Sequence, residues 1–155
     1  MIIVVVSITV CQGQNSKKAK DSAQTAETKL LIDGQRYFFL AQSMYPNRGG
    51  MRQLTVGYNL KVTKDTLKSE LPYFGRAYQA GYGSEGALEF TSLEFDYKTA
   101  KGKKNTWEIT ITPKDVKNCR EMILTIYENG SADLKVLSNE KESISFKGNI
   151  AASKN

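Results

Sequence analysis

The feature that most constrains the fold is a two-residue turn signal, Asn129-Gly130, between two segments of alternating hydrophobicity. Asn-Gly suits the tight turn of a two-residue β-hairpin, because both residues tolerate a positive φ angle. The pattern predicts antiparallel strands over residues 121–128 and 131–138. On their apolar faces, we expect Met122, Leu124 and Ile126 to pair with Ala132, Leu134 and Val136.

Six further segments have strand character, with alternating or aromatic-rich patterns: residues 36–44, 53–62, 66–71, 87–97, 106–112 and 142–150. Residues 53–62 alternate most regularly. In 87–97 the alternation slips, since Leu88 and Phe90 share one parity and Leu93, Phe95 and Tyr97 the other. One extra residue near Thr91-Ser92, a β-bulge, would keep all five side chains on one face.

These segments predict an all-β, mainly antiparallel domain of about eight strands, because short connections join antiparallel neighbours. All three prolines lie at strand ends, where they remove no ladder donor. One-sided alternation leaves two architectures open, a sandwich and a partly closed barrel. One short helix is expected over 23–32, with Ala23, Ala26 and Leu30 on one stripe and Asp33-Gly34 at its end.

The first thirteen residues resemble an export leader. Residues 2–10 are apolar but too few to span a bilayer as a helix, which is typical of a signal-peptide core. Cleavage after Gly13 would give a soluble protein, whereas lipidation of Cys11 would anchor it, although Val10 suits a lipoprotein signal poorly. We expect export to the periplasm or cell envelope, a flexible tether over 14–21, and a single domain over 22–155.

The composition excludes several kinds of chemistry. The chain has no histidine, which removes histidine-based triads and nearly all zinc sites. It shows no nucleotide-binding or catalytic motif, so we expect neither cofactor nor metal. The net charge of +6 comes from scattered lysines and arginines, and a solvated basic surface is favoured over a nucleic-acid site. Cys119, between Asn118 and Arg120, is expected to be a partly buried spectator.

Carboxylates are the remaining candidates for catalysis. Glu85, Glu89, Glu94 and Asp96 lie close together in the sequence, and a pair across a cleft could hydrolyse a glycosidic bond. In strands, however, these residues alternate with apolar ones, which is typical of a solvated face.

The stretch LPYFGRAYQAGY, residues 71–82, is the candidate binding loop. Its aromatic side chains could stack on a sugar or an aromatic ligand, and Arg76 could bind a carboxylate or phosphate. The alternative is that the aromatics close one end of the barrel or sandwich. The candidate ligand-binding residues are Tyr73, Phe74, Arg76, Tyr78 and Tyr82.

The same stretch carries a resemblance to a known family. LPYFGRAY follows a YxLKVxxD strand at 58–65 and precedes the Asp96-Tyr97 pair, GxAxLxV at 130–136 and ISFKGNI at 144–150. Over about residues 26–150 the chain resembles a Bacteroidetes family of small exported or lipid-anchored proteins of unknown function. The resemblance implies a cell-envelope location and supplies no activity, cofactor or catalytic residue.

These observations favour a non-enzymatic envelope protein that acts as a binding or accessory module. Its partner would be a glycan, a small molecule or another envelope protein, with membrane contact only through a lipid anchor. Two alternatives remain open: a carboxylate-dependent hydrolase of envelope polysaccharide, and a structural subunit that pairs through an exposed edge strand.

Overall fold

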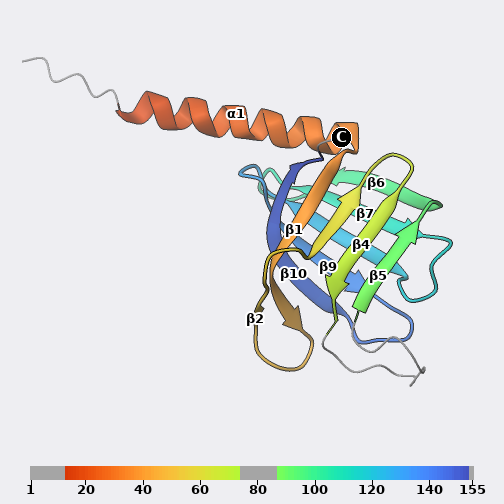
Figure 1. Ribbon diagram of the computed structural model, residues 1–155. Coiled ribbons are helices and arrows are strands. Elements are labelled where there is room, and N and C mark those ends of the chain that lie inside the picture. Colours follow the sequence, from red (N-terminus) through yellow and green to blue (C-terminus); the bar gives the residue numbers. More distant parts are fainter. Residues whose placement is uncertain (1–12, 74–86, 154–155) are drawn as a thin grey trace, which may run out of the picture.

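The computed structural model describes residues 13–73 and 87–153, which form one helix and ten strands. Figure 1 shows the helix extending away from a strongly curved sheet. The elements are α1 (Gly13–Gly34), β1 (Tyr37–Pro46), β2 (Arg52–Gln53), β3 (Asn59–Val62), β4 (Leu67–Pro72), β5 (Ala87–Ser92), β6 (Phe95–Lys101), β7 (Trp107–Pro113), β8 (Glu121–Ile126), β9 (Ser131–Leu137) and β10 (Ile144–Ala152).

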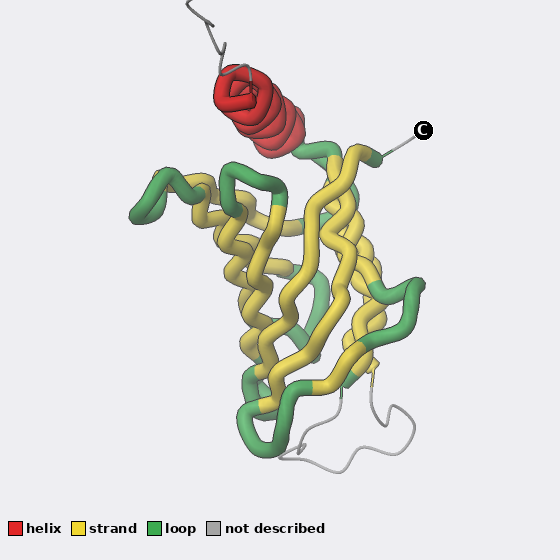
Figure 2. Tube along the Cα trace, turned by 90° about the vertical axis from the view of Figure 1, so that its left-hand side faces the viewer, coloured by secondary structure: helices red, strands yellow, loops and turns green. Residues whose placement is uncertain are grey.

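The strands form one antiparallel sheet in the order β5-β4-β3-β1-β10-β9-β8-β7-β6, with β2 paired to β1. The two outermost strands, β5 and β6, are consecutive in the sequence, so the sheet curls until its ends are joined by the chain itself. Figure 2 shows the strands wrapping around a common interior. The predicted all-β antiparallel class is confirmed, and the architecture is a nearly closed barrel.

A hairpin forms at Asn129-Gly130 with the predicted apolar pairs, but its turn is not the predicted two-residue one. Tyr127 and Ser131 close the loop, so residues 128–130 form it, and Asn129 does not take a positive φ angle. Gly130 has a φ angle of 81°, and the Tyr127 amide donates to the Ser131 carbonyl at 2.9 Å. The Asn129 side chain holds the turn, since its Oδ1 accepts the Ser131 amide at 3.0 Å. The predicted apolar positions share one face, in the pairs Met122–Val136, Leu124–Leu134 and Ile126–Ala132.

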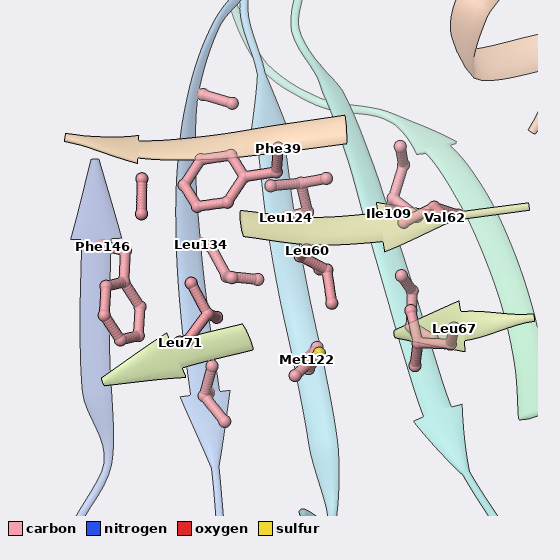
Figure 3. Close-up of a cluster of buried hydrophobic side chains, with 14 of the residues drawn as sticks. Phe39, Leu60, Val62, Leu67, Leu71, Ile109, Met122, Leu124, Leu134 and Phe146 are labelled. Atoms are coloured by element: carbon pink, nitrogen blue, oxygen red, sulfur yellow. The ribbon is translucent and has the colours of Figure 1, made fainter. Parts of the chain in front are cut away.

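The core lies inside the barrel, where inward residues of opposite walls meet (Figure 3). Phe39 and Leu60 approach Leu124 and Leu134 from the facing strands, and all four are fully buried. Alternation places these side chains inward, because successive residues of a strand point to opposite faces. Burial of their apolar surface is the main source of stability.

The regular alternation of residues 53–62 did not produce one strand. Only Arg52–Gln53 and Asn59–Val62 pair, both with the same edge of β1. Between them the chain leaves the sheet at Gly57, which has a φ angle of 124°, and Val56 is fully exposed. β1 is itself irregular at this level, because its register with β10 on the opposite edge shifts between Ala41 and Ser43.

The phase slip in residues 87–97 is a corner between two strands and not a bulge. β5 ends at Ser92 and β6 begins at Phe95, and the two strands pair with different neighbours. Leu93, predicted to face inward, is 67% exposed at the corner. The carboxylate of Asp115 holds the corner by accepting the Leu93 amide at 2.8 Å and the Ser92 hydroxyl.

We predict a pH-dependent role for Asp115. The Ser92 hydroxyl, followed by the Leu93 amide, lowers the pKa of this carboxyl below its ordinary value. The ionised form therefore stabilises the fold above the unfolded pKa of about 3.9, and this contribution is lost as the pH falls through the lower native pKa. Asp115→Ala should lower the urea midpoint at pH 7, with the difference from the parent protein shrinking below about pH 4.

Asp21→Ala is the control for this experiment, because Asp21 lies exposed on α1, away from the corner. It should leave the midpoint unchanged. A difference between Asp115→Ala and the parent protein that persists undiminished at pH 2 would contradict the role of the ionised carboxylate.

The helix is longer than predicted and turns a different face to the barrel. Residues 14–21, expected to be a flexible tether, are helical and continuous with the rest of α1. The predicted apolar stripe of Ala23, Ala26 and Leu30 faces solvent, whereas Thr28 and Ile32 are buried. None of the helical residues in the part of the chain that the structure describes forms an apolar segment long enough to cross a membrane.

Contact with the β8–β9 hairpin explains the reversed face of α1. The Thr28 hydroxyl donates to the Glu128 carbonyl at 3.4 Å, beside the turn at Gly130. A Cβ atom on Gly130 would lie 3.3 Å from the Gln24 side chain, so the helix approaches the turn closely. Thr28 is small and can donate a hydrogen bond, so it fits against the hairpin backbone. The larger, apolar Leu30 could not donate to the Glu128 carbonyl.

Candidate functional site

Tyr73 is the one predicted ligand-binding residue that the structure describes. It follows β4, is only 4% exposed, and donates its hydroxyl to the Glu142 carbonyl at 3.1 Å. The side chain thus ties the end of β4 to the connection between β9 and β10, which is the end-closing role given above as the alternative. The other predicted residues, Phe74, Arg76, Tyr78, Tyr82 and the lipidation candidate Cys11, lie outside the described residues.

Charged groups surround Tyr73 at this end of the barrel, which we call the loop end. The Lys141 ammonium lies 4.8 Å from the centroid of the Tyr73 ring, within cation–π range. Nε of Arg48, from the β1–β2 connection, is 3.9 Å from a carboxylate oxygen of Glu142. The loop-end cluster therefore consists of Arg48, Tyr73, Lys141 and Glu142, which come from three connections far apart in the sequence.

The opposite end of the barrel carries an open cleft of about 600 Å³, which we call the helix-end cleft. This volume lies within the usual range for small-molecule sites. The cleft lies between the end of α1, the β3–β4 turn and the end of β10. It is lined by Leu30, Leu31, Gly34, Gln35, Arg36, Thr63, Lys64, Asp65, Ala152 and Ser153.

The end of α1 shapes one wall of this cleft. The Arg36 amide donates to the Leu31 carbonyl and the Gln35 amide to the Ile32 carbonyl, at 3.3 and 3.1 Å, which is a Schellman motif. The left-handed position is taken by Gln35, with a φ angle of 47°, and not by Gly34. The helix ends where predicted, and its last turn presents Leu30, which is 72% exposed, to the cleft.

The β3–β4 turn supplies the opposite wall. The Thr63 hydroxyl lies 2.9 Å from a carboxylate oxygen of Asp65, and it accepts the Thr66 amide at 3.0 Å. Hydrogen bonds from Thr63 and Thr66 lower the pKa of Asp65, so this carboxylate is ionised at neutral pH. With Arg36 and Lys64, the cleft combines two cations and one anion with apolar surface.

No local signal in the sequence could have revealed the helix-end cleft. Its lining comes from residues 30–36, 63–65 and 152–153, which only the tertiary fold brings together. Leu30 itself is predicted to lie on a buried helical stripe, because an apolar side chain at that spacing usually packs inward, and the structure instead exposes it.

The carboxylates proposed for hydrolysis do not form a catalytic pair among the described residues. Glu89 and Glu94 are exposed, and Asp96 forms an ion pair with Lys114 at 2.8 Å, whereas Glu85 lies outside the described residues. The Lys114 ammonium lowers the pKa of Asp96, which is the wrong direction for a general acid at neutral pH.

Cys119 and the metal-ligating side chains are the remaining candidates among the described residues. Cys119 is buried, and its burial raises the thiol pKa to about 12, so the nucleophilic thiolate is not populated at neutral pH. Cys119 is more deeply buried than the partly buried position that the sequence predicted. Within residues 13–73 and 87–153, no three histidine, cysteine, aspartate or glutamate side chains gather as a metal site would require.

Comparison with known proteins identifies the family. No curated protein matches the chain. Among solved structures, a DUF4251 family protein from Bacteroides eggerthii matches with a TM-score of 0.65 and 14% identity, over 87% of this chain and 91% of that one. At this identity, the match shows a common fold. A family model described as "Domain of unknown function (DUF4251)" matches residues 19–150, and the chain therefore belongs to the DUF4251 family.

Proposed function

We propose that this protein is an exported, non-enzymatic binding module of the cell envelope, and that the helix-end cleft is its ligand site. The observation that carries the proposal is Leu30, a large apolar side chain that is 72% exposed at the edge of a cleft containing charged and hydrogen-bonding groups. Ligand pockets typically combine apolar surface with a few convergent polar groups. Export is supported by the apolar run at residues 2–10.

The chemistry of the cleft indicates the kind of ligand. Leu30, Leu31 and Ala152 offer apolar contact, while Arg36 and Lys64 bring two positive charges to the cleft lining. A small molecule, glycan fragment or peptide end with an apolar portion and a carboxylate would use both. Hydrolysis is less well supported, because Asp96 is paired with Lys114 and its pKa is lowered.

Pairing through an edge strand is also less well supported. The outer strand β6 carries Lys98 and Lys101, and lysines on an edge strand oppose the addition of another strand. The end strands β5 and β6 are joined directly by the chain, which leaves the sheet nearly closed.

A ligand screen with matched leucine variants tests the proposal. The purified protein is screened by thermal shift against envelope glycan fragments, acyl carboxylates and short peptides, and hits are titrated. Leu30→Ser should weaken binding about tenfold, because it removes exposed apolar contact without disturbing the core. Leu93→Ser is the control, since Leu93 is 67% exposed at the β5–β6 corner, away from the cleft lining.

The outcomes distinguish the two candidate sites. If Leu30→Ser and Leu93→Ser bind the hit equally well, the cleft is not the site. If the double variant Arg76→Ala, Tyr78→Ala loses binding while its melting temperature is unchanged, the ligand site is the predicted loop. If no ligand of these classes binds, the proposed binding function is wrong.

A further inference from the structure

Lys141 stands out because it is the one charged residue that is buried among those the structure describes. Its side chain is 8% exposed, and the other buried polar residues are serines and threonines. The chain places it in the β9–β10 connection, where the Ser138 hydroxyl accepts its amide at 3.2 Å. Lysine is almost never fully buried unless it is paired, so its surroundings require an explanation.

The surroundings of Lys141 supply no complete partner. Its ammonium lies over the Tyr73 ring, which offers a cation–π contact and no negative charge. The ion pairs among residues 13–73 and 87–153 do not include Lys141. The carboxylate next to it in the sequence, Glu142, is engaged by Arg48. Among the described residues, the Lys141 ammonium thus has no carboxylate within ion-pair distance.

The ammonium is nevertheless not fully enclosed. No enclosed side-chain nitrogen or oxygen of the described residues lacks a hydrogen-bond partner, and Nζ of Lys141 has no such bond there. Nζ therefore keeps some exposure, although Lys141 as a whole is only 8% exposed. The Tyr73 ring beneath the ammonium is held in place, because the Tyr73 hydroxyl donates to the Glu142 carbonyl at 3.1 Å.

We propose that the loop-end cluster is an anion-binding site. In it, the Lys141 ammonium is the principal group that binds the anion, and Arg48 supplies a second positive charge. The ammonium is held in one place by the buried stem and the Tyr73 ring, so binding costs little side-chain entropy. Arg48 lies beside it, with a side chain that is 72% exposed and its Nε 3.9 Å from the Glu142 carboxylate. The ligand is an oxyanion, such as the carboxylate or phosphate of an envelope component.

This site is separate from the helix-end cleft, which lies at the other end of the barrel. The argument for it does not depend on the proposed ligand of that cleft. Either site can therefore fail experimentally while the other stands.

Titration of the full chain with inorganic phosphate, sulfate and acetate tests the proposal, with sodium chloride at matched ionic strength as the reference. We expect a saturable shift of the melting temperature and chemical-shift changes at the Tyr73 ring for at least one oxyanion. Lys141→Met, which keeps an apolar stem, should weaken this binding about tenfold or more, since a charged hydrogen bond is lost. Lys141→Arg should retain it.

Lys147→Met is the matched control. Lys147 also lies over a tyrosine ring, 5.3 Å from the centroid of Tyr45, but its side chain is exposed. This variant should bind the oxyanion as the parent protein does. The proposal is overturned if no oxyanion acts beyond the chloride reference, or if Lys141→Met and Lys147→Met respond alike. If phosphate and sulfate bind but acetate does not, the site selects phosphate-like anions.

Discussion

Replacement of Gly148 by alanine is expected to cost more than about 3 kcal/mol of folding free energy, enough to leave a large unfolded population in a marginally stable domain. Gly148 lies on β10 opposite Ala41 of β1. A Cβ atom at this position would lie 1.9 Å from the Leu40 carbonyl oxygen and 2.8 Å from its carbonyl carbon. Both are backbone atoms, so they cannot move aside as a flexible side chain could.

The irregularity of β1 is the reason for this contact. The register between β1 and β10 shifts between Ala41 and Ser43, next to the pair that contains Gly148. Bulges bend the strand locally and bring backbone close to the partner, where glycine alone fits. Gly148→Ala should be measured by urea denaturation and by the yield of soluble protein.

Gly50→Ala is the control, because a Cβ atom there has no neighbour within 4 Å. It should change the free energy of unfolding by no more than about 0.5 kcal/mol. A Gly148→Ala protein with the same urea midpoint as Gly50→Ala would show that β1 and β10 can separate without cost, which would contradict the close approach.

Phe39→Ala is expected to cost about 3–5 kcal/mol, the usual range for truncation of a buried phenylalanine. Phe39 is fully buried on β1, opposite Leu60 of β3 and Ile150 of β10. Its ring contributes to the group of side chains that fills the interior (Figure 3). The loss combines the transfer free energy of the ring with the cavity that remains. Urea denaturation followed by circular dichroism would measure it.

The neighbouring Phe38 provides the control, since it has the same chemistry on the other face of the same strand. It is half-buried on the outside of the barrel, where the Lys61 ammonium lies 5.7 Å from its ring centroid. Phe38→Ala should cost only about 1 kcal/mol. Equal losses for Phe38→Ala and Phe39→Ala would mean that the inward face of β1 has been assigned wrongly.

Local patterns predicted the strands well and their connections poorly. The Asn129-Gly130 hairpin formed with the expected pairs, because its turn and its alternation are properties of adjacent residues. The segments 53–62 and 87–97 were each read as one strand but are interrupted, at Gly57 and at the Leu93-Glu94 corner. Whether an alternating segment pairs along its whole length depends on the edge that it meets, which is a distant part of the chain.

The candidate sites depended still more on distant residues. Tyr73 was found by its place in the loop motif, but its buried position follows from the Glu142 carbonyl, 69 residues away. Lys141 carried no signal, since a lysine in a polar connection ordinarily faces solvent. Leu30 was assigned to the core, yet the helix face that meets the barrel is set by the hairpin backbone at Glu128 and requires the small Thr28.

The sequence by itself determined the fold class, because two-residue periodicity, prolines at strand ends and one strong turn signal are local consequences of backbone geometry. It also determined that histidine chemistry is impossible, since the residue is missing from the chain. The tertiary structure decided that the sheet closes nearly into a barrel, which face of α1 is buried, and which side chains meet at the two ends. Those features depend on contacts between segments far apart in the chain, whose free energies no local pattern encodes.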